Sequence, residues 1–246
     1  MTLPRRVTEE RLDHLAPDDP AAMRSRRDLV RVHRAMGTRA IVARGWQALM
    51  LPRSGDVPLK ILEIGAGDGT LLLGVARTLA RHWPPVQLTL LDRQDIVSAA
   101  TLQAYADLGW LVRVQVADVL AWAEQPEAAA HGVAPRRWDL ITTTLFLHHF
   151  DGGQLDQLLR AVASRSDRFF ACEPKRSWGP LLGSHLVAAI GANAVTREDA
   201  VLSVHAGFRD KEIGAAWPQP GAAWQSREFA AGLFSHCFSA HRAGME

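Results

Sequence analysis

Between residues 58 and 175, segments with a strand-like pattern of apolar and polar positions alternate with segments that have a helix-like pattern. Short apolar runs, typical of buried strands, cover 59–65, 86–92, 111–118, 138–145 and 168–174. Longer segments with apolar residues at helical spacing cover 70–83, 95–110, 119–130 and 152–166. Because strands that alternate with helices form parallel sheets covered on both faces, the pattern predicts a doubly wound α/β domain.

The N-terminal part has a different pattern. Residues 1–55 predict a helical extension, in which Asp19 is the N-cap and Pro20 the first helical residue. A turn-rich boundary follows at 52–58. We therefore expect the main domain to cover 56–246.

The alternation of strands and helices ends after the fifth predicted strand. Residues 178–216 predict two or three helices, one of them with a start resembling a capping box at Thr196. An insertion over about 178–220 is therefore expected to cover a substrate. Residues 224–242 contain two strand-like runs around a short turn, which predicts an antiparallel hairpin that ends the sheet.

Composition narrows the class of protein. The chain has 246 residues, 48% hydrophobic and 22% charged, as in an ordinary soluble globular protein. A net charge of +2 argues against a dedicated nucleic-acid binder. Cys172 and Cys237 are too few for a disulfide scaffold, and the N-terminus has no apolar leader. No run approaches the roughly 20 apolar residues of a membrane span. We expect a cytoplasmic protein.

A glycine-rich loop joins the first strand of the domain to its helix. Its sequence is Glu63-Ile-Gly65-Ala-Gly67-Asp-Gly69. Such a strand–loop–helix unit presents backbone N–H groups to a ligand at the start of the helix. The dinucleotide fingerprint would require glycine where Thr70 stands, and the G-K-[ST] of a phosphate-binding loop is absent.

The loop resembles the first motif of the class I S-adenosylmethionine-dependent methyltransferases. Asp92 and Asp118 stand at the ends of the next two predicted strands, and Asp139 matches the start of that family's fourth strand. The resemblance covers residues 58–175 clearly. It implies a Rossmann-like, mostly parallel seven-stranded sheet with an antiparallel C-terminal hairpin, and S-adenosylmethionine as the cofactor.

The resemblance also implies roles for residues. Glu63 would help bind the ammonium end of the cofactor, Asp92 its ribose and Asp118 its adenine amine. Asp92 and Asp118 could instead cap the following helices, and one residue can do both. The full set expected to bind the cofactor is Glu63, Gly65, Ala66, Gly67, Gly69, Asp92, Arg93, Asp118, Val119 and Thr144.

Two later segments resemble particular branches of the superfamily. Residues 145–150, LFLHHF, resemble the ubiquinone/menaquinone-biosynthesis-like group. Residues 171–208 resemble enzymes that methylate phenolic or quinone-like rings. These likenesses imply methylation of a small aromatic, phenolic or quinone-like acceptor, at oxygen rather than carbon, in secondary or lipid-quinone metabolism.

Methylation of a phenol requires a group that takes its proton. A phenol has a pKa of about 10, and a histidine with a pKa near 6.5 is a suitable acceptor. His148 and His149 are the candidates, and we expect one of them to face the pocket. Glu173 would orient a histidine, bind the acceptor or pair with Arg176. No metal site is expected, because a His-His pair alone is a poor zinc signature.

The sequence bears on three other functions. An RNA methyltransferase is supported only by the arginine-rich N-terminus, and Cys172 does not lie in the Pro-Cys or Thr-Cys setting of the cytosine-C5 enzymes. Thr70 argues against a nicotinamide-dependent oxidoreductase. A non-catalytic scaffold that binds the cofactor stays open. The expected partner is a small aromatic or lipidic molecule rather than nucleic acid, with a homodimer as an open option.

Overall fold

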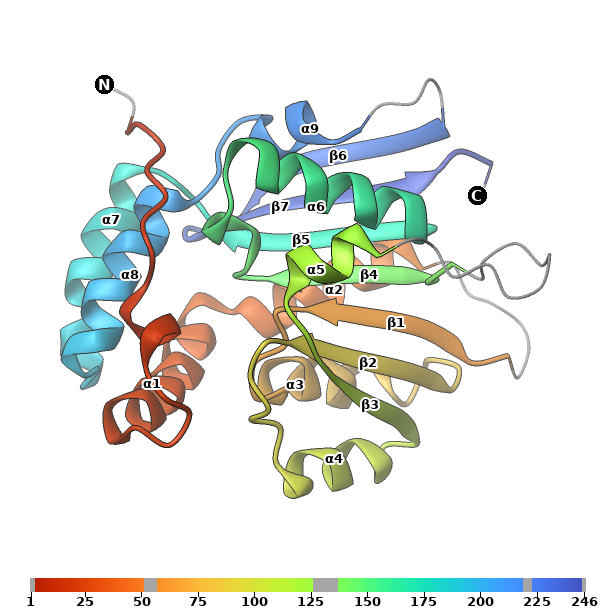
Figure 1. The fold of residues 1–246 in the computed structure, drawn as a ribbon, viewed down its shortest axis with the longest axis horizontal. Helices are drawn as coiled ribbons and strands as arrows, with labels where there is room; N and C mark the ends of the chain where they lie inside the picture. Colours follow the sequence, from red (N-terminus) through yellow and green to blue (C-terminus); the bar gives the residue numbers. More distant parts are fainter. Residues whose placement is uncertain (1–2, 51–56, 126–136, 219–222, 245–246) are drawn as a thin grey trace.

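A single seven-stranded sheet organises the chain (Figure 1). The computed structural model describes residues 3–50, 57–125, 137–218 and 223–244. The strands are Leu59–Ile64 (β1), Val86–Asp92 (β2), Trp110–Val116 (β3), Leu140–Thr144 (β4), Arg168–Pro174 (β5), Trp224–Ala231 (β6) and Ser235–Arg242 (β7). Their order in the sheet is β3-β2-β1-β4-β5-β7-β6. β1 to β5 pair in parallel, and β7 pairs antiparallel with both β5 and β6. The predicted fold class and terminal hairpin are confirmed.

Helices cover both faces of the sheet and the carboxyl ends of its strands. The α-helices are Pro20–Met36 (α1), Thr38–Leu49 (α2), Thr70–Leu79 (α3), Ala99–Ala106 (α4), Val119–Glu124 (α5), Gly152–Arg165 (α6), Trp178–His185 (α7), Ala194–Ala206 (α8) and Glu212–Ala216 (α9). The 3₁₀ helices are Arg11–His14 (η1), Leu147–His149 (η2) and Leu186–Ile190 (η3). Among the described residues, no helix combines the length and the apolar character that crossing a bilayer requires.

Two apolar layers hold the helices against the sheet. One layer packs α2, α3 and α4 against the sheet, the other packs α5, α6 and α9 against it, and both include residues of β1, β2, β4 and β5. Trp46 of α2 is fully buried, and its Nε1–H donates a hydrogen bond to Thr142 Oγ1 at 3.3 Å. A Cβ atom at Gly45 would lie 2.2 Å from the Phe170 ring, so glycine permits close contact between α2 and the sheet. This packing fixes α2 directly on β5.

Most predicted element starts are confirmed. Asp19 caps α1, accepting from the N–H groups of Ala21 at 2.7 Å and Ala22 at 3.3 Å. The helix start predicted at Thr196 is wrong. α8 begins two residues earlier, because Asn193 Oδ1 accepts the Thr196 N–H at 2.8 Å and caps the helix itself.

Other boundaries differ or fall outside the described residues. α3 ends at Leu79, because the chain turns before the predicted end at residue 83. α5 ends at Glu124, and the remainder of the helix predicted to residue 130 lies outside the described residues from 126 on. The predicted boundary at 52–58 lies mostly outside them as well.

The carboxyl ends of β1 to β5 are covered by the N-terminal segment and by helices that follow β5. α1, α7 and α8 gather there, together with residues 3–19, which we call the N-terminal strap (Figure 1). Ligands of open α/β sheets bind at this edge. The topology therefore places the functional site between the strand ends and the strap.

Candidate functional site

A cavity of about 960 Å³ lies at this edge of the sheet. Its floor comes from the loops after β1, β2, β3 and β4, and its cover from the strap, α1, α7 and α8. All the proposed site residues except Gly69 and Glu173 are among its lining residues. The structure thus brings most of the predicted site residues together around one cavity.

The glycine loop forms one wall of the cavity. Gly65, Gly67 and Gly69 have φ angles of 73°, 55° and 73°, a left-handed conformation that favours glycine. A Cβ at Gly65 would lie 2.2 Å from the Phe146 ring, whereas one at Gly67 would meet nothing within 4 Å. Gly65 is therefore needed for packing, and Gly67 leaves open space for a ligand against its backbone.

Asp92 braces this loop. Its Oδ2 accepts the Gly67 N–H at 2.8 Å, and its Oδ1 accepts the Gln94 N–H at 2.9 Å. The alternative that Asp92 caps the next helix is wrong, because Ser98 caps α4.

Asp118 caps a helix while also lining the cavity. Its Oδ1 accepts the N–H groups of Leu120 at 2.8 Å and Ala121 at 3.0 Å, at the start of α5. Asp139 lies at the opposite end of the strands, where its Oδ2 accepts the Lys60 N–H at 2.8 Å. Asp118 is thus available to the site and Asp139 is not.

Glu63 is a buried acid with one unpaired oxygen. The side chain ends β1 at 2% exposure, and its Oε2 has no hydrogen-bond partner among the residues that the structure describes. Burial, and then the charges of Asp92 and Asp68, raise the pKa of Glu63 well above its usual value. A buried carboxylate facing a cavity with an unpaired oxygen suits a cationic ligand group.

The other expected binding residues surround this centre. Ala66, Val119 and Thr144 are buried in the cavity wall, and Thr144 Oγ1 also lacks a hydrogen-bond partner among the described residues. Arg93 is drawn to the strap, where its guanidinium lies 3.2 Å from Asp13 Oδ1. Leu145, just after β4, has a φ of 54°, and such strain in a bulky residue is typical of functional sites.

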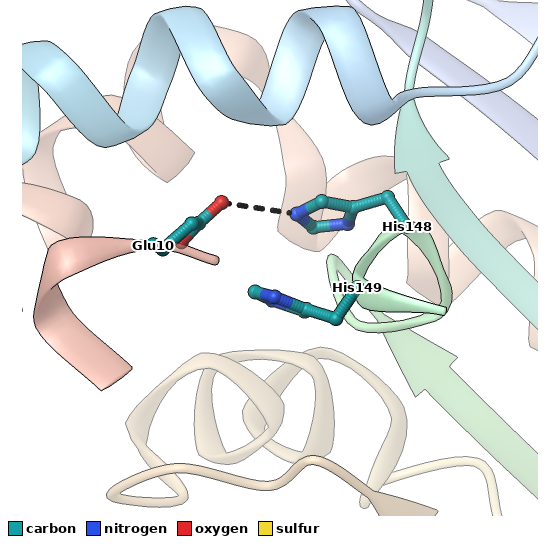
Figure 2. A group of neighbouring side chains, drawn as sticks. All are labelled: Glu10, His148 and His149. Carbon is teal, nitrogen blue, oxygen red and sulfur yellow. Dashed lines mark hydrogen bonds and ion pairs between the residues drawn. The ribbon is translucent and has the colours of Figure 1, made fainter. Parts of the chain in front are cut away.

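His148 is held between two carboxylates. Its Nδ1 lies 2.9 Å from Glu173 Oε2 and its Nε2 lies 3.3 Å from Glu10 Oε1 (Figure 2). Glu173 is fully buried and also accepts the N–H groups of Phe146 at 3.1 Å and Leu147 at 3.0 Å. Glu173 therefore orients a histidine.

The alternative partner proposed for Glu173 is wrong. Arg176 forms its ion pair with Glu212. Its guanidinium also donates to the carbonyl oxygens of Leu3 and Gly207, both at 3.0 Å. Arg176 thus fixes the start of the strap instead of entering the site.

His149 lies beside His148. The ring centroids are 4.3 Å apart with 32° between the planes, and His149 Nδ1 lies 3.4 Å from Asp13 Oδ2. Both histidines line the cavity, so the expectation that only one would face it is wrong. The reason is local. In the 3₁₀ turn η2, adjacent side chains do not point to opposite sides as they do in a strand.

The two imidazoles differ in their electrostatic surroundings. Burial alone would lower the pKa of His148, but hydrogen bonds and charge from Glu10 and Glu173 outweigh it and raise the pKa to about 9. Burial and the adjacent His148 lower the pKa of His149. Burial favours a higher pKa for Glu10, and the contacts with His148 bring it below its usual value. The cluster therefore concentrates negative charge around one imidazolium.

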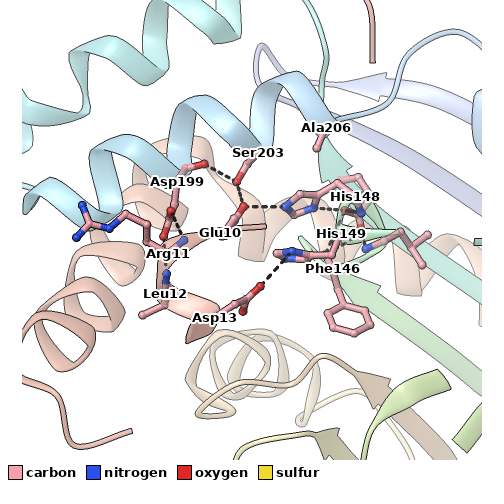
Figure 3. A network of polar contacts seen from close by, with 12 residues as sticks. Glu10, Arg11, Leu12, Asp13, Phe146, His148, His149, Asp199, Ser203 and Ala206 are labelled. Carbon is pink, nitrogen blue, oxygen red and sulfur yellow. Dashed lines mark hydrogen bonds and ion pairs between the residues drawn. The ribbon is translucent and has the colours of Figure 1, made fainter. Parts of the chain in front are cut away.

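The sequence analysis missed the residues that complete this cluster. Glu10 accepts a hydrogen bond from Ser203 of α8, and Asp199 accepts the N–H groups of Arg11 at 2.8 Å and Leu12 at 3.0 Å (Figure 3). These contacts join segments 187 to 193 residues apart. No motif marks the acids of the strap, and only the fold brings them to the site.

The chain was compared with known proteins. No family model and no curated protein matches its sequence. Among solved structures, the plantazolicin methyltransferase BpumL in complex with a triazolic desmethylPZN analog and SAH (S-adenosylhomocysteine) is 14% identical, with a TM-score of 0.61 over 91% of this chain and 92% of that one.

Two further solved structures match most of this chain, but this chain spans less than two thirds of their length. An O-methyltransferase family protein from Burkholderia thailandensis is 15% identical, with a TM-score of 0.55 over 94% of this chain and 62% of that one. The mitomycin 7-O-methyltransferase MmcR is 19% identical, with a TM-score of 0.53 over 94% and 60%. These matches establish the Rossmann-like methyltransferase fold.

Asp199 is expected to control the strap. In Asp199→Asn, one of the two acceptor oxygens becomes an NH₂ group that opposes a backbone N–H. Losing a buried hydrogen bond costs about 1–3 kcal/mol, which corresponds to roughly 5- to 140-fold in a local opening constant. Hydrogen exchange should accelerate by this factor at Arg11 and Leu12. Glu198→Gln is the control, since Glu198 contacts only the exposed side chain of Arg11 in this segment. Equal exchange in both variants would contradict the assignment.

Proposed function

We propose that this chain is an S-adenosylmethionine-dependent methyltransferase that methylates a small aromatic acceptor at oxygen. One observation carries the proposal. Glu63, buried and with an unpaired oxygen, faces the cavity beside a glycine loop whose Gly67 backbone is open to a ligand. A cationic amino-acid end and a flat nucleoside would satisfy both features.

The residues of the cavity fit this cofactor. Glu63 would bind its ammonium group, the Gly65–Gly69 backbone its amino-acid tail, Asp92 its ribose and Asp118 its adenine amine. Ala66, Arg93, Val119 and Thr144 would complete the wall. Bound there, the cofactor would supply an electrophilic methyl group. Two of the structural neighbours, a plantazolicin methyltransferase in complex with SAH and a mitomycin 7-O-methyltransferase, support this proposal.

The apolar residues that cover the cavity support the proposal of a small, largely apolar acceptor. The cavity beyond the glycine loop is lined by Leu29, Val30, Met36, Phe150, Val187 and Phe234. Its total volume of about 960 Å³ leaves room beside a nucleoside cofactor. The neighbour named as a mitomycin 7-O-methyltransferase favours oxygen as the methylated atom. We also propose a phenolic or quinone-like ring, and a role in secondary or lipid-quinone metabolism, from the resemblances of residues 145–150 and 171–208. The location of the protein and its oligomeric state stay predictions from the sequence.

His149 is the proposed proton acceptor. Both nitrogens of His148 are engaged by carboxylates, whereas His149 has a single, longer contact to Asp13. Removing the proton of a phenol at pH 7 accounts for about 4 kcal/mol of barrier. In this arrangement Glu173 and His148 are positioning residues, because they fix the turn that carries His149.

Transfer of label tests the activity. We expect the wild-type chain to move the methyl group of labelled S-adenosylmethionine onto the oxygen of hydroxyaromatic acceptors, identified by mass spectrometry. His149→Ala should lower kcat by about 10²- to 10⁴-fold, the usual contribution of a general base. SAH affinity in this variant should not change. SAH binding without transfer to any acceptor would instead favour the non-catalytic scaffold.

The glycine loop provides a test that does not require the acceptor. In Gly67→Val, the side chain would occupy the open space at a φ of 55°. We expect calorimetry to show at least a 100-fold loss of SAH affinity, or about 3 kcal/mol. Gly109→Val is the matched control, since Gly109 has a φ of 76°, equally open surroundings and no place in the cavity. Retained affinity in Gly67→Val would overturn the proposed cofactor site.

Glu63 should make binding depend on pH. The acids that face it, Asp68 and Asp92, hold its proton in the empty protein, and the Tyr105 phenol also lies near. The ammonium group of SAH would favour the carboxylate form, so binding should release a proton. Affinity should therefore rise with pH above the usual glutamate value of 4.5. Calorimetry in buffers of different ionisation heat measures this release. Glu63→Gln should bind more weakly and release no proton, and unchanged proton release would contradict the role.

A further inference from the structure

Three side chains from two distant segments converge at the cover of the cavity. Glu10 of the strap and His148 and His149 of η2 each offer one ligand atom, and these atoms all lie within 4.8 Å of one another (Figure 2). We propose that Glu10, His148 and His149 form a binding site for one divalent transition-metal ion, with Zn²⁺ as the reference ion. Metal binding itself does not rest on the proposed methyl transfer, whereas a role of the ion toward an acceptor does.

The distances suit such an ion. Zn–N and Zn–O bonds of about 2.0–2.2 Å at a tetrahedral angle place two ligand atoms roughly 3.3 Å apart. His148 Nε2 and Glu10 Oε1 are already 3.3 Å apart. Because no pair exceeds 4.8 Å, the third ligand would have to approach by about 1.5 Å at most. His149 can supply this movement, because its side chain is 21% exposed, whereas His148 is fixed at 3%.

Each of the two histidines has a carboxylate next to its Nδ1 atom. The His148 Nδ1 contact with Glu173, at 2.9 Å, leaves Nε2 directed at Glu10. A carboxylate on the far nitrogen is the usual partner of a metal-bound histidine, since it fixes the tautomer and the ring orientation. His149 Nδ1 lies 3.4 Å from Asp13 Oδ2, so a carboxylate lies next to the second imidazole as well. Ser203 in turn holds Glu10.

The charge and chemical nature of the cluster favour a transition metal. Glu10, Asp13 and Glu173 bring three carboxylates to two imidazoles, and a dication would offset their negative charge while it displaces the proton from His148 Nε2. Imidazole ligands select Zn²⁺, Co²⁺ or Ni²⁺ over Mg²⁺ and Ca²⁺, which prefer oxygen.

Three protein ligands leave one tetrahedral position open toward the cavity, as in catalytic zinc sites. A hydroxyl group of the acceptor could take that position, where a bound ion lowers the pKa of the hydroxyl. With an ion present, activation of the acceptor would come from the metal, and the histidines would serve as its ligands.

The test is metal titration of the full-length, untagged chain after chelator treatment, without cofactor or acceptor. Calorimetry with Zn²⁺ should show one saturable site per chain, and Co²⁺ should give the visible absorption of a tetrahedral complex. Glu10→Gln and His149→Ala should each lower Zn²⁺ affinity at least 10- to 100-fold, since even loss of a supporting carboxylate has this effect.

An exposed pair on the same strap provides the matched control. His14 Nε2 and Glu9 Oε2 lie 3.0 Å apart, with 60% and 84% of their side chains exposed. Glu9→Gln and His14→Ala should keep wild-type Zn²⁺ affinity. Circular dichroism of each variant would show that the fold is retained.

Absence of saturable 1:1 binding would overturn the proposal. So would equal affinity in Glu10→Gln and the wild type, or a loss confined to the control variants. Because this measurement needs no cofactor, failure to bind SAH would overturn the proposed function and leave the metal site standing. Conversely, SAH binding without saturable Zn²⁺ binding would overturn the metal site and leave the proposed function standing.

Discussion

The hydrogen bond from the Gly67 N–H to Asp92 Oδ2 joins the loop after β1 to the end of β2. Parallel pairing of these strands places both carboxyl ends at one edge, and the register Ile64↔Leu91 brings the loop within reach of the aspartate. Left-handed φ angles then turn the backbone of the loop away from the sheet. This hydrogen bond therefore determines the open wall of the cavity and the position of Glu63 in its lining.

The second half of the site depends on the buried carboxylate of Glu173. Burying a charge is costly unless hydrogen bonds and an opposite charge compensate it. Here the N–H groups at the start of η2 and the imidazole of His148 provide that compensation. These contacts stabilise the turn, because moving it away would remove partners of the buried Glu173 carboxylate. The stabilised turn places both histidines at the cavity.

Local signals explain how much the sequence could predict. Periodicity predicted the strands and helices, and Asp19 predicted the start of the first helix. The acids at the strand ends indicated the edge of the sheet at which the cavity lies. The error at Thr196 arose because Asn193 is an equally good cap that the pattern did not separate. Glu10 could not be predicted, since its partners His148 and Ser203 lie 138 and 193 residues away in sequence. The pairing of the two histidines depended on a 3₁₀ turn that periodicity does not reveal.

The two halves of the site are also stabilised differently. The floor belongs to strands and helices packed in the apolar layers, whereas η1 of the strap contains no buried residue. Polar contacts hold the strap instead, among them Asp199 to two backbone N–H groups and Arg5 to the carbonyl oxygens of Ala206 and Phe150, both at 2.8 Å. Each such bond contributes only about 0.5–1.5 kcal/mol net. The strap is therefore less stabilised by apolar packing than the floor, and we expect local opening to begin in the strap.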